Sequence, residues 1–280
     1  MRGAALAGAA LCFLAAGCAG PHAVAFGGSR QAVEGWAAQR GFRPETLDVG
    51  GFRLFALRRQ SSPATTLTIY IEGDGAPWPS VFRPPADPTP SYPVALALAE
   101  RDPAPAVAYL GRPCQYLDDR ERSDCDVAYW SGLRYSEAAL RAMDEAVGRL
   151  KSHAGTGKVR LVGHSGGGVV AALLAHRRDD VASLITVAAP LALSEWAAAQ
   201  GLTPLAGSLD PLAQRPGAAW ASALHFAGAC DAVVPPAIVA RFVQARGGRM
   251  ENVAGFDHDC CWARDWAELL RRARIGGTLP

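Results

Sequence analysis

Short apolar runs alternate with helical segments over most of this chain, and this alternation limits its possible folds more than any other feature. The runs are rich in Val, Ile and Leu and cover residues 65–71, 107–110, 159–162, 184–187, 224–227 and 250–253. Continuous runs of this kind are typical of strands that are buried on both faces. Because helical segments separate them, we expect an α/β fold with a mostly parallel central sheet and helices on both faces.

The composition is that of one compact domain. The chain has 280 residues, of which 50% are hydrophobic, enough to bury one large core. Its 28 Lys and Arg residues nearly balance 26 Asp and Glu residues, giving a formal charge of +2. So small and scattered a charge excludes a basic groove, and we expect no nucleic acid partner.

We divide the chain into a leader (1–17), a tether and entry segment (18–43) and one domain (44–280). Near the start of the domain, apolar and polar residues alternate around Gly50-Gly51, which predicts an antiparallel hairpin with a tight turn. Nine prolines in residues 76–105 predict an ordered surface loop there, interrupted at most by a short helix over residues 93–100.

The N-terminus is predicted to be an export signal. Met1-Arg2 precedes a short apolar run over residues 4–16, too short to form a stable membrane span. The run ends in Leu-Ala-Ala-Gly-Cys18, which resembles a bacterial lipoprotein signal. Cleavage before Cys18 would leave a lipidated N-terminus, the only membrane attachment that we expect. The alternative is an ordinary signal peptide without lipid, and either one places the protein in the cell envelope or outside the cell.

Export implies an oxidising compartment, where cysteine pairs become disulfides. Cys114 and Cys125 flank a polar segment, so a disulfide closing this surface loop is the simplest pairing. Cys230 could pair with Cys260 or with Cys261, which leaves one thiol over.

Residues 159–174 carry the strongest chemical signal. They run from an apolar strand through Gly-His-Ser-Gly-Gly into a helix, which is the nucleophile-elbow pattern. Ser165 would occupy a strained turn at a helix N-terminus, where backbone amides favour negative charge on a substrate oxygen. The alternative is a glycine-rich turn that serves only close packing. Neither this segment nor Gly155-Thr-Gly-Lys158 matches a nucleotide-binding loop.

A serine hydroxyl becomes a good nucleophile only when a base takes its proton, and that base is usually a histidine held by a carboxylate. His258 lies in the predicted loop after the last strand. Asp231 follows the strand before it, at the carboxyl end where α/β sheets gather their active sites. Asp210 is the alternative acid, and we expect His176 and His225 to be structural.

Together these segments resemble the α/β-hydrolase superfamily over residues 47–274. The likeness rests on Gly163-His-Ser-Gly-Gly, Gly228-x-x-Asp231 and Gly255-x-x-His258. It implies an α/β-hydrolase fold with Ser165, Asp231 and His258 as a catalytic triad. It also implies a small cap insertion, which we place at residues 190–222.

The resemblance further implies an oxyanion hole. One donor is the backbone amide of Gly166, and the other comes from the loop after the third strand. Family members often have His-Gly where this chain has Glu72-Gly73, so the expected second donor is the amide of Asp74. The carboxylate of Asp74 must then point away from the forming oxyanion.

The reaction that the resemblance implies is acyl transfer to water, with a small-molecule or lipid acyl substrate. No organic cofactor and no metal is implied. A zinc site combining His258 with the nearby cysteines is disfavoured because the chain lacks the paired C-x₂-C spacing of such sites. The alternative function is that of a non-catalytic envelope lipoprotein that uses the scaffold for binding. The oligomeric state is left open.

Overall fold

The computed structural model describes residues 26–76, 78–80, 83–215 and 217–275. The predicted leader and Cys18 lie outside these residues. Within the part of the chain that is described, no helix is both long enough and apolar enough to span a membrane.

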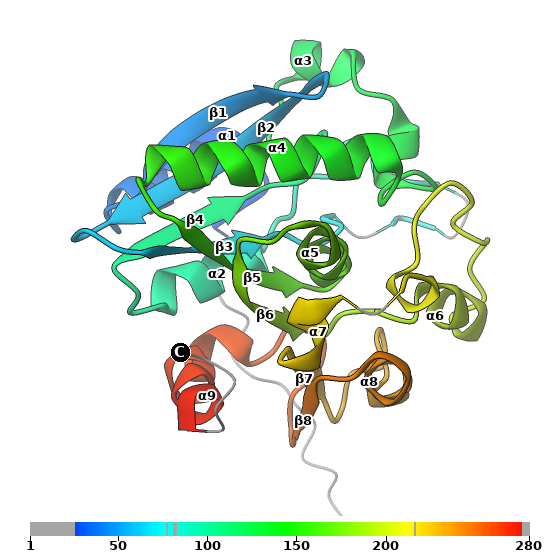
Figure 1. Cartoon of the computed structure of the whole chain (residues 1–280). Coiled ribbons are helices and arrows are strands. Elements are labelled where there is room, and N and C mark those ends of the chain that lie inside the picture. Colours follow the sequence, from blue (N-terminus) through cyan, green and yellow to red (C-terminus); the bar gives the residue numbers. More distant parts are fainter. Residues whose placement is uncertain (1–25, 77, 81–82, 216, 276–280) are drawn as a thin grey trace, which may run out of the picture.

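An eight-stranded sheet forms the centre of the protein, in the order β1-β2-β4-β3-β5-β6-β7-β8 (Figure 1). The strands are β1 (Arg43–Val49), β2 (Phe52–Gln60), β3 (Thr66–Ile71), β4 (Ala106–Leu110), β5 (Lys158–His164), β6 (Val181–Val187), β7 (Leu224–Gly228) and β8 (Arg249–Val253). β2 pairs antiparallel with both β1 and β4, and every other pair is parallel. The predicted mostly parallel sheet is confirmed. So is the hairpin, whose turn places Gly50 and Gly51 at φ values of 54° and 84°.

Helices cover both faces of this sheet (Figure 1). They are α1 (Arg30–Ala38), α2 (Val94–Arg101), α3 (Asp119–Ser123), α4 (Glu137–His153), α5 (Gly166–Arg177), α6 (Leu193–Ala199), α7 (Ala218–Ala221), α8 (Pro236–Arg246) and α9 (Trp262–Ile275), with 3₁₀ turns η1 (Val127–Trp130) and η2 (Pro211–Ala213). The buried side chains of α1, α2 and α9 belong to one apolar cluster. Those of α4, α5 and α8 belong to another. Two separate cores explain why the strands are apolar on both faces.

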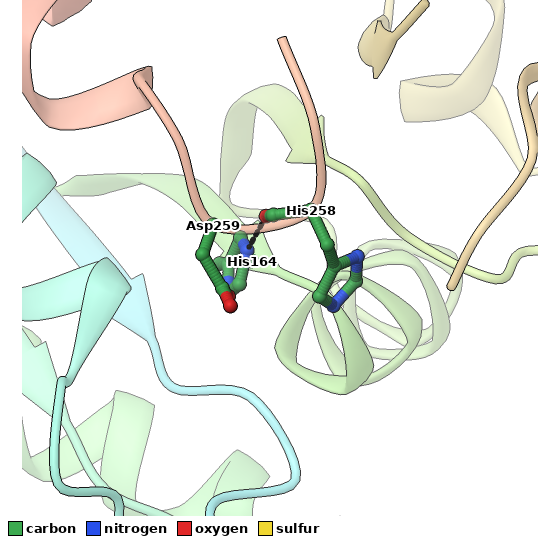
Figure 2. Close-up of side chains that lie close together, drawn as sticks. All are labelled: His164, His258 and Asp259. Carbon is green, nitrogen blue, oxygen red and sulfur yellow. Dashed lines mark hydrogen bonds between the residues drawn. The ribbon is translucent and has the colours of Figure 1, made fainter. Parts of the chain in front are cut away.

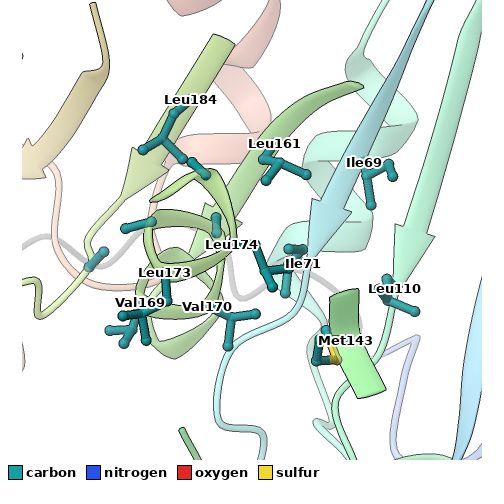
Figure 3. Packing of buried hydrophobic residues seen from close by; sticks show 14 of the residues in the cluster. Ile69, Ile71, Leu110, Met143, Leu161, Val169, Val170, Leu173, Leu174 and Leu184 are labelled. Carbon is teal, nitrogen blue, oxygen red and sulfur yellow. The ribbon is translucent and has the colours of Figure 1, made fainter. Parts of the chain in front are cut away.

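Helix α5 lies against the middle of the sheet and is buried almost throughout. Figure 3 shows Val170 and Leu174 of this helix packed toward Ile71 and Leu161 of the neighbouring strands. A helix that is apolar on all sides fits only in such an enclosed position. Its N-terminus is therefore fixed at the carboxyl edge of the sheet, beside the ends of β5 and β6.

The contact between β5 and α5 leaves no room for a side chain at Gly163. A Cβ atom there would lie 2.2 Å from the carbonyl oxygen of Gly167. We expect Gly163→Ala to cost about 3 kcal/mol of unfolding free energy, because backbone atoms cannot move aside cheaply. The matched control is Gly148→Ala in α4, where an added Cβ meets nothing within 4 Å. That change should stabilise the protein by about 0.5–1 kcal/mol. Urea unfolding of both variants measures the contrast, and similar effects would contradict it.

Candidate active site

Three side chains from distant parts of the sequence meet at the carboxyl edge of the sheet. Ser165 lies between β5 and α5, Asp231 follows β7, and His258 lies between β8 and α9. The Oγ of Ser165 is 3.0 Å from Nε2 of His258. Nδ1 of the same imidazole is 2.9 Å from Oδ2 of Asp231. The structure thus brings together all three residues of the predicted triad.

Ser165 has the strained backbone of an elbow, with φ at 51° and ψ at −126°. Its amide donates to the carbonyl oxygen of Val187 at 2.8 Å, and its own carbonyl accepts from the amide of Gly168 at 2.9 Å. A non-glycine residue at positive φ is uncommon and persists only where its surroundings impose it. Here the adjacent strand and the first turn of α5 hold the serine in place.

The surroundings of Asp231 fix the tautomer of the histidine. The side chain of this aspartate is fully buried. Its Oδ1 accepts hydrogen bonds from the amides of Val233 and Val234, at 2.8 and 2.7 Å. An ionised carboxylate can only accept, so Nδ1 of His258 must carry the proton that it donates. Nε2 then has its lone pair free to receive the hydroxyl proton of Ser165.

His164 was not predicted to have a role, yet it supports the loop that carries His258. Its Nε2 donates to the backbone carbonyl of His258 at 3.0 Å (Figure 2). The indole of Trp262 donates to the same oxygen at 3.1 Å. Burial, and next the neighbouring His258, lower the pKa of His164 to about 3, so this ring is neutral at physiological pH. The only signal in the sequence was its position next to the serine.

The geometry also fits the two predicted oxyanion donors. Gly73 lies against the serine, since a Cβ added to it would be 3.4 Å from Cβ of Ser165. Among the described residues, no protein group accepts a hydrogen bond from the amide of Asp74 or of Gly166. Both amides therefore remain available to a substrate oxygen.

The carboxylate of Asp74 is held by three side chains that no sequence motif groups together. Arg134 donates to it at 2.8 Å, Arg112 at 3.3 Å, and the hydroxyl of Tyr135 at 2.7 Å. Burial would raise the pKa of Asp74, but the charges of Arg134 and Arg112 outweigh burial and hold that pKa below its usual value. A Cβ on Gly166 would lie only 2.0 Å from Oδ1 of Asp74, so this carboxylate lies against one of the two residues expected to donate to the oxyanion.

We therefore expect Arg134→Leu to lower kcat roughly 10- to 100-fold, or about 1.4–2.7 kcal/mol. With one guanidinium gone, the Asp74 carboxylate would oppose charge developing on the substrate oxygen a few ångströms away. Adding Asp74→Asn to this variant removes the repulsion and should restore most of the loss. Steady-state kinetics of the single and double variants measure the coupling. Equal kcat values for the two variants would contradict it.

Glu72 is buried at the end of β3, one residue before the oxyanion loop. Its Oε1 accepts from the amide of Gly73 at 2.8 Å. Burial raises its pKa to about 7, although hydrogen bonds from Gly73 and nearby groups act in the opposite direction.

This shift predicts how stability depends on pH. The ordinary pKa of Glu72 is 4.5, so between pH 4.5 and 7 the folded protein holds a proton that the unfolded chain has lost. The stabilising effect is complete below this window and disappears as pH rises through it. Glu72→Gln removes this dependence on pH. The difference in unfolding free energy between the variant and the unmodified protein should therefore shift in favour of the variant by up to about 3 kcal/mol from pH 5 to pH 8. Urea unfolding at both pH values tests this, and a pH-independent difference would refute it.

The cysteines pair only partly as expected. Cys114 and Cys125 form the predicted disulfide. The predicted bridge from Cys230 to Cys260 or Cys261 is wrong, because those two neighbours are bonded to each other and Cys230 is a free, exposed thiol. The acid loop, which carries Asp231, and the histidine loop, which carries His258, are instead joined by a backbone hydrogen bond. The amide of Cys230 donates to the carbonyl of Phe256 at 2.8 Å.

The alternative acid, Asp210, lies elsewhere. Its carboxylate accepts from the amides of Leu193 and Ser194 at the start of α6, and so caps that helix. The predicted cap insertion contains α6, η2 and α7. Helix α6 contacts the acid loop, because the indole of Trp196 donates to the carbonyl of Val233 at 2.7 Å.

A hollow of about 710 Å³ lies between the β1–β2 turn and the loop closed by the disulfide. None of its lining residues belongs to the triad. The site is identified by its chemistry and not by this cavity.

Comparison with known proteins agrees with this geometry. Residues 133–210, which include Ser165, match the model of the PGAP1-like alpha/beta domain. A search of curated proteins finds no match.

Several solved structures are similar over most of their length. Est1E from Butyrivibrio proteoclasticus is 17% identical with a TM-score of 0.55, over 83% of this chain and 98% of Est1E. An alpha-beta serine hydrolase homologue from Coxiella burnetii is 16% identical with a TM-score of 0.54, and the match covers 82% of this chain and 96% of the homologue. A membrane phospholipase A, described as a bacterial virulence factor, is 17% identical with a TM-score of 0.57, and the match covers 88% of this chain and 90% of the phospholipase. The α/β-hydrolase fold is thus confirmed, and the structural neighbours include a serine hydrolase homologue and a phospholipase.

Proposed function

We propose that this protein is a serine hydrolase that cleaves an ester or related acyl bond through an acyl-enzyme on Ser165. The observation that carries the proposal is the continuous hydrogen-bonded series from Asp231 through His258 to Ser165. The amides of Asp74 and Gly166 support it as well, because neither donates to any residue that the structure describes and an acyl-transfer site needs such donors.

The reaction follows from the protonation states. Nε2 of His258 takes the hydroxyl proton while Oγ of Ser165 attacks the carbonyl carbon of the substrate. The resulting oxyanion is stabilised by the amides of Asp74 and Gly166. The imidazolium then protonates the leaving alcohol, which departs and leaves the acyl group on the serine. Water, activated by the same imidazole, releases the acid and restores the enzyme.

Two exposed apolar side chains near the site support a hydrophobic acyl group as substrate. Trp78 is 38% exposed and stacks against Arg134, which holds Asp74. Val233 is 47% exposed and lies two residues after the acid Asp231. Exposed large hydrophobic residues beside a reactive centre are suited to contact with apolar parts of a ligand.

Labelling with a fluorophosphonate probe tests the proposal, since the probe reacts with activated serines. We expect one label per chain, competed by substrate, and hydrolysis of p-nitrophenyl esters. A panel of increasing acyl length then identifies the preferred substrate, with long chains indicating lipid and short chains a small-molecule ester. A folded protein that neither takes the label nor cleaves any ester would instead support the non-catalytic binding function.

We also propose that the chain is exported and carries lipid on Cys18. The pattern of residues 1–18 supports this, and so does the Cys114–Cys125 disulfide, because such bonds persist in oxidising compartments. Expression in a bacterial host followed by fractionation tests it. The Cys18→Ser variant should leave the membrane fraction, and an unchanged distribution would contradict lipidation.

A further inference from the structure

We propose that a divalent transition-metal ion such as Zn²⁺ binds at His164, His258 and Asp259 and switches the triad off. One ligand atom from each of these residues lies within 4.8 Å of the others. The regulatory effect rests on the proposed hydrolase function, whereas the binding of the ion does not. Figure 2 shows the three side chains gathered beneath the loop that carries His258.

The donor set fits this class of ion. Two imidazole nitrogens and one carboxylate oxygen are ligands that zinc commonly takes, with a fourth position left to water. Hard cations such as Mg²⁺ and Ca²⁺ prefer sites made of oxygen atoms, so they should bind poorly here. The site differs from one built on the cysteines, since Cys260 and Cys261 are bonded to each other.

The third ligand is free to move toward the ion. Asp259 is exposed, and none of the described residues hydrogen-bonds its carboxylate. Tetrahedral zinc at about 2.1 Å from each donor places neighbouring donors roughly 3.4 Å apart. Because no two of the ligand atoms are more than 4.8 Å apart, a pair must approach by at most roughly 1.4 Å, which rotations of the Asp259 and His258 side chains can supply.

Binding and catalysis exclude each other because both use the same lone pair. Nδ1 of His258 donates its proton to Asp231, so Nε2 holds the lone pair that faces the hydroxyl of Ser165. An ion coordinated by Nε2 leaves the serine without a base. Inhibition should then be reversible by a chelator, without any loss of folded protein.

The test measures ion binding and activity separately. Cys230 is an exposed thiol that could bind zinc by itself, so every variant carries Cys230→Ser. Isothermal titration with ZnCl₂ uses an added Ser165→Ala, which leaves all three ligands in place. We expect one ion per chain, and an affinity at least about tenfold weaker once Asp259→Asn is added. The matched control is Asp179→Asn, an exposed carboxylate at the opposite edge of the sheet, which should leave the affinity unchanged.

In the active protein, ZnCl₂ should abolish ester hydrolysis, and EDTA should restore it. Asp259→Asn should raise the inhibitory zinc concentration at least tenfold while keeping activity without metal. Equal affinities with and without Asp259 would overturn the proposal. If zinc binds as expected but no variant hydrolyses esters, the proposed function fails and the metal site stands.

Discussion

Ser165→Ala is expected to lower kcat for ester hydrolysis by about six orders of magnitude and to abolish labelling by a fluorophosphonate. The variant removes the only atom that can form the acyl-enzyme, and the hydrogen bond at 3.0 Å to His258 is lost with it. The fold should be kept, because the hydroxyl makes no capping hydrogen bond to α5. Burst kinetics and thermal unfolding measure the two effects separately.

The matched control is Ser194→Ala, an exposed serine in α6 whose side chain makes no hydrogen bond with the described residues. It should keep full activity and full labelling. If Ser165→Ala retained more than a small fraction of the turnover while remaining folded, another nucleophile would have to be sought.

Asp231→Asn is expected to lower kcat by about four orders of magnitude. The amides of Val233 and Val234 would hold the side-chain oxygen of the asparagine, so its amide nitrogen would face His258. Nδ1 of His258 would then have to accept a hydrogen bond instead of donating one. The imidazole would adopt the other tautomer, whose Nε2 carries a hydrogen and cannot receive the proton of the serine.

Asp210→Asn is the informative companion, because it changes the other candidate acid. Asp210 caps α6 and does not contact the imidazole, so we expect kcat to be kept and stability to change by at most about 1 kcal/mol. Steady-state kinetics of both variants decide between the two carboxylates. A larger loss from Asp210→Asn than from Asp231→Asn would reverse the assignment.

The fold was predictable because its strands are marked by local patterns. Buried strands such as β3 and β5 consist of apolar residues, and the turn at Gly50-Gly51 has the glycines that its positive φ values require. The grouping of Ser165 with the acid and the base was also predictable, since each follows a strand and parallel strands end at one edge.

The parts that were missed depend on contacts between distant segments. Arg112 and Arg134 reach Asp74 from two different loops, and no periodicity or motif marks either of them. The predicted disulfide of Cys230 was wrong for a related reason. Counting thiols shows how many bridges are possible, but the fold decides which sulfur atoms meet.

The place of His258 in the chain affects when activity can first appear. The nucleophile and the acid precede β8, whereas the backbone carbonyl of His258 accepts a hydrogen bond from the indole of Trp262, at the start of α9. Segments that emerge first, from the ribosome or on the far side of a membrane, are able to fold first. A partly folded chain can thus complete the turn that carries Ser165 while it still lacks a base, and it stays inert until α9 has docked against the sheet.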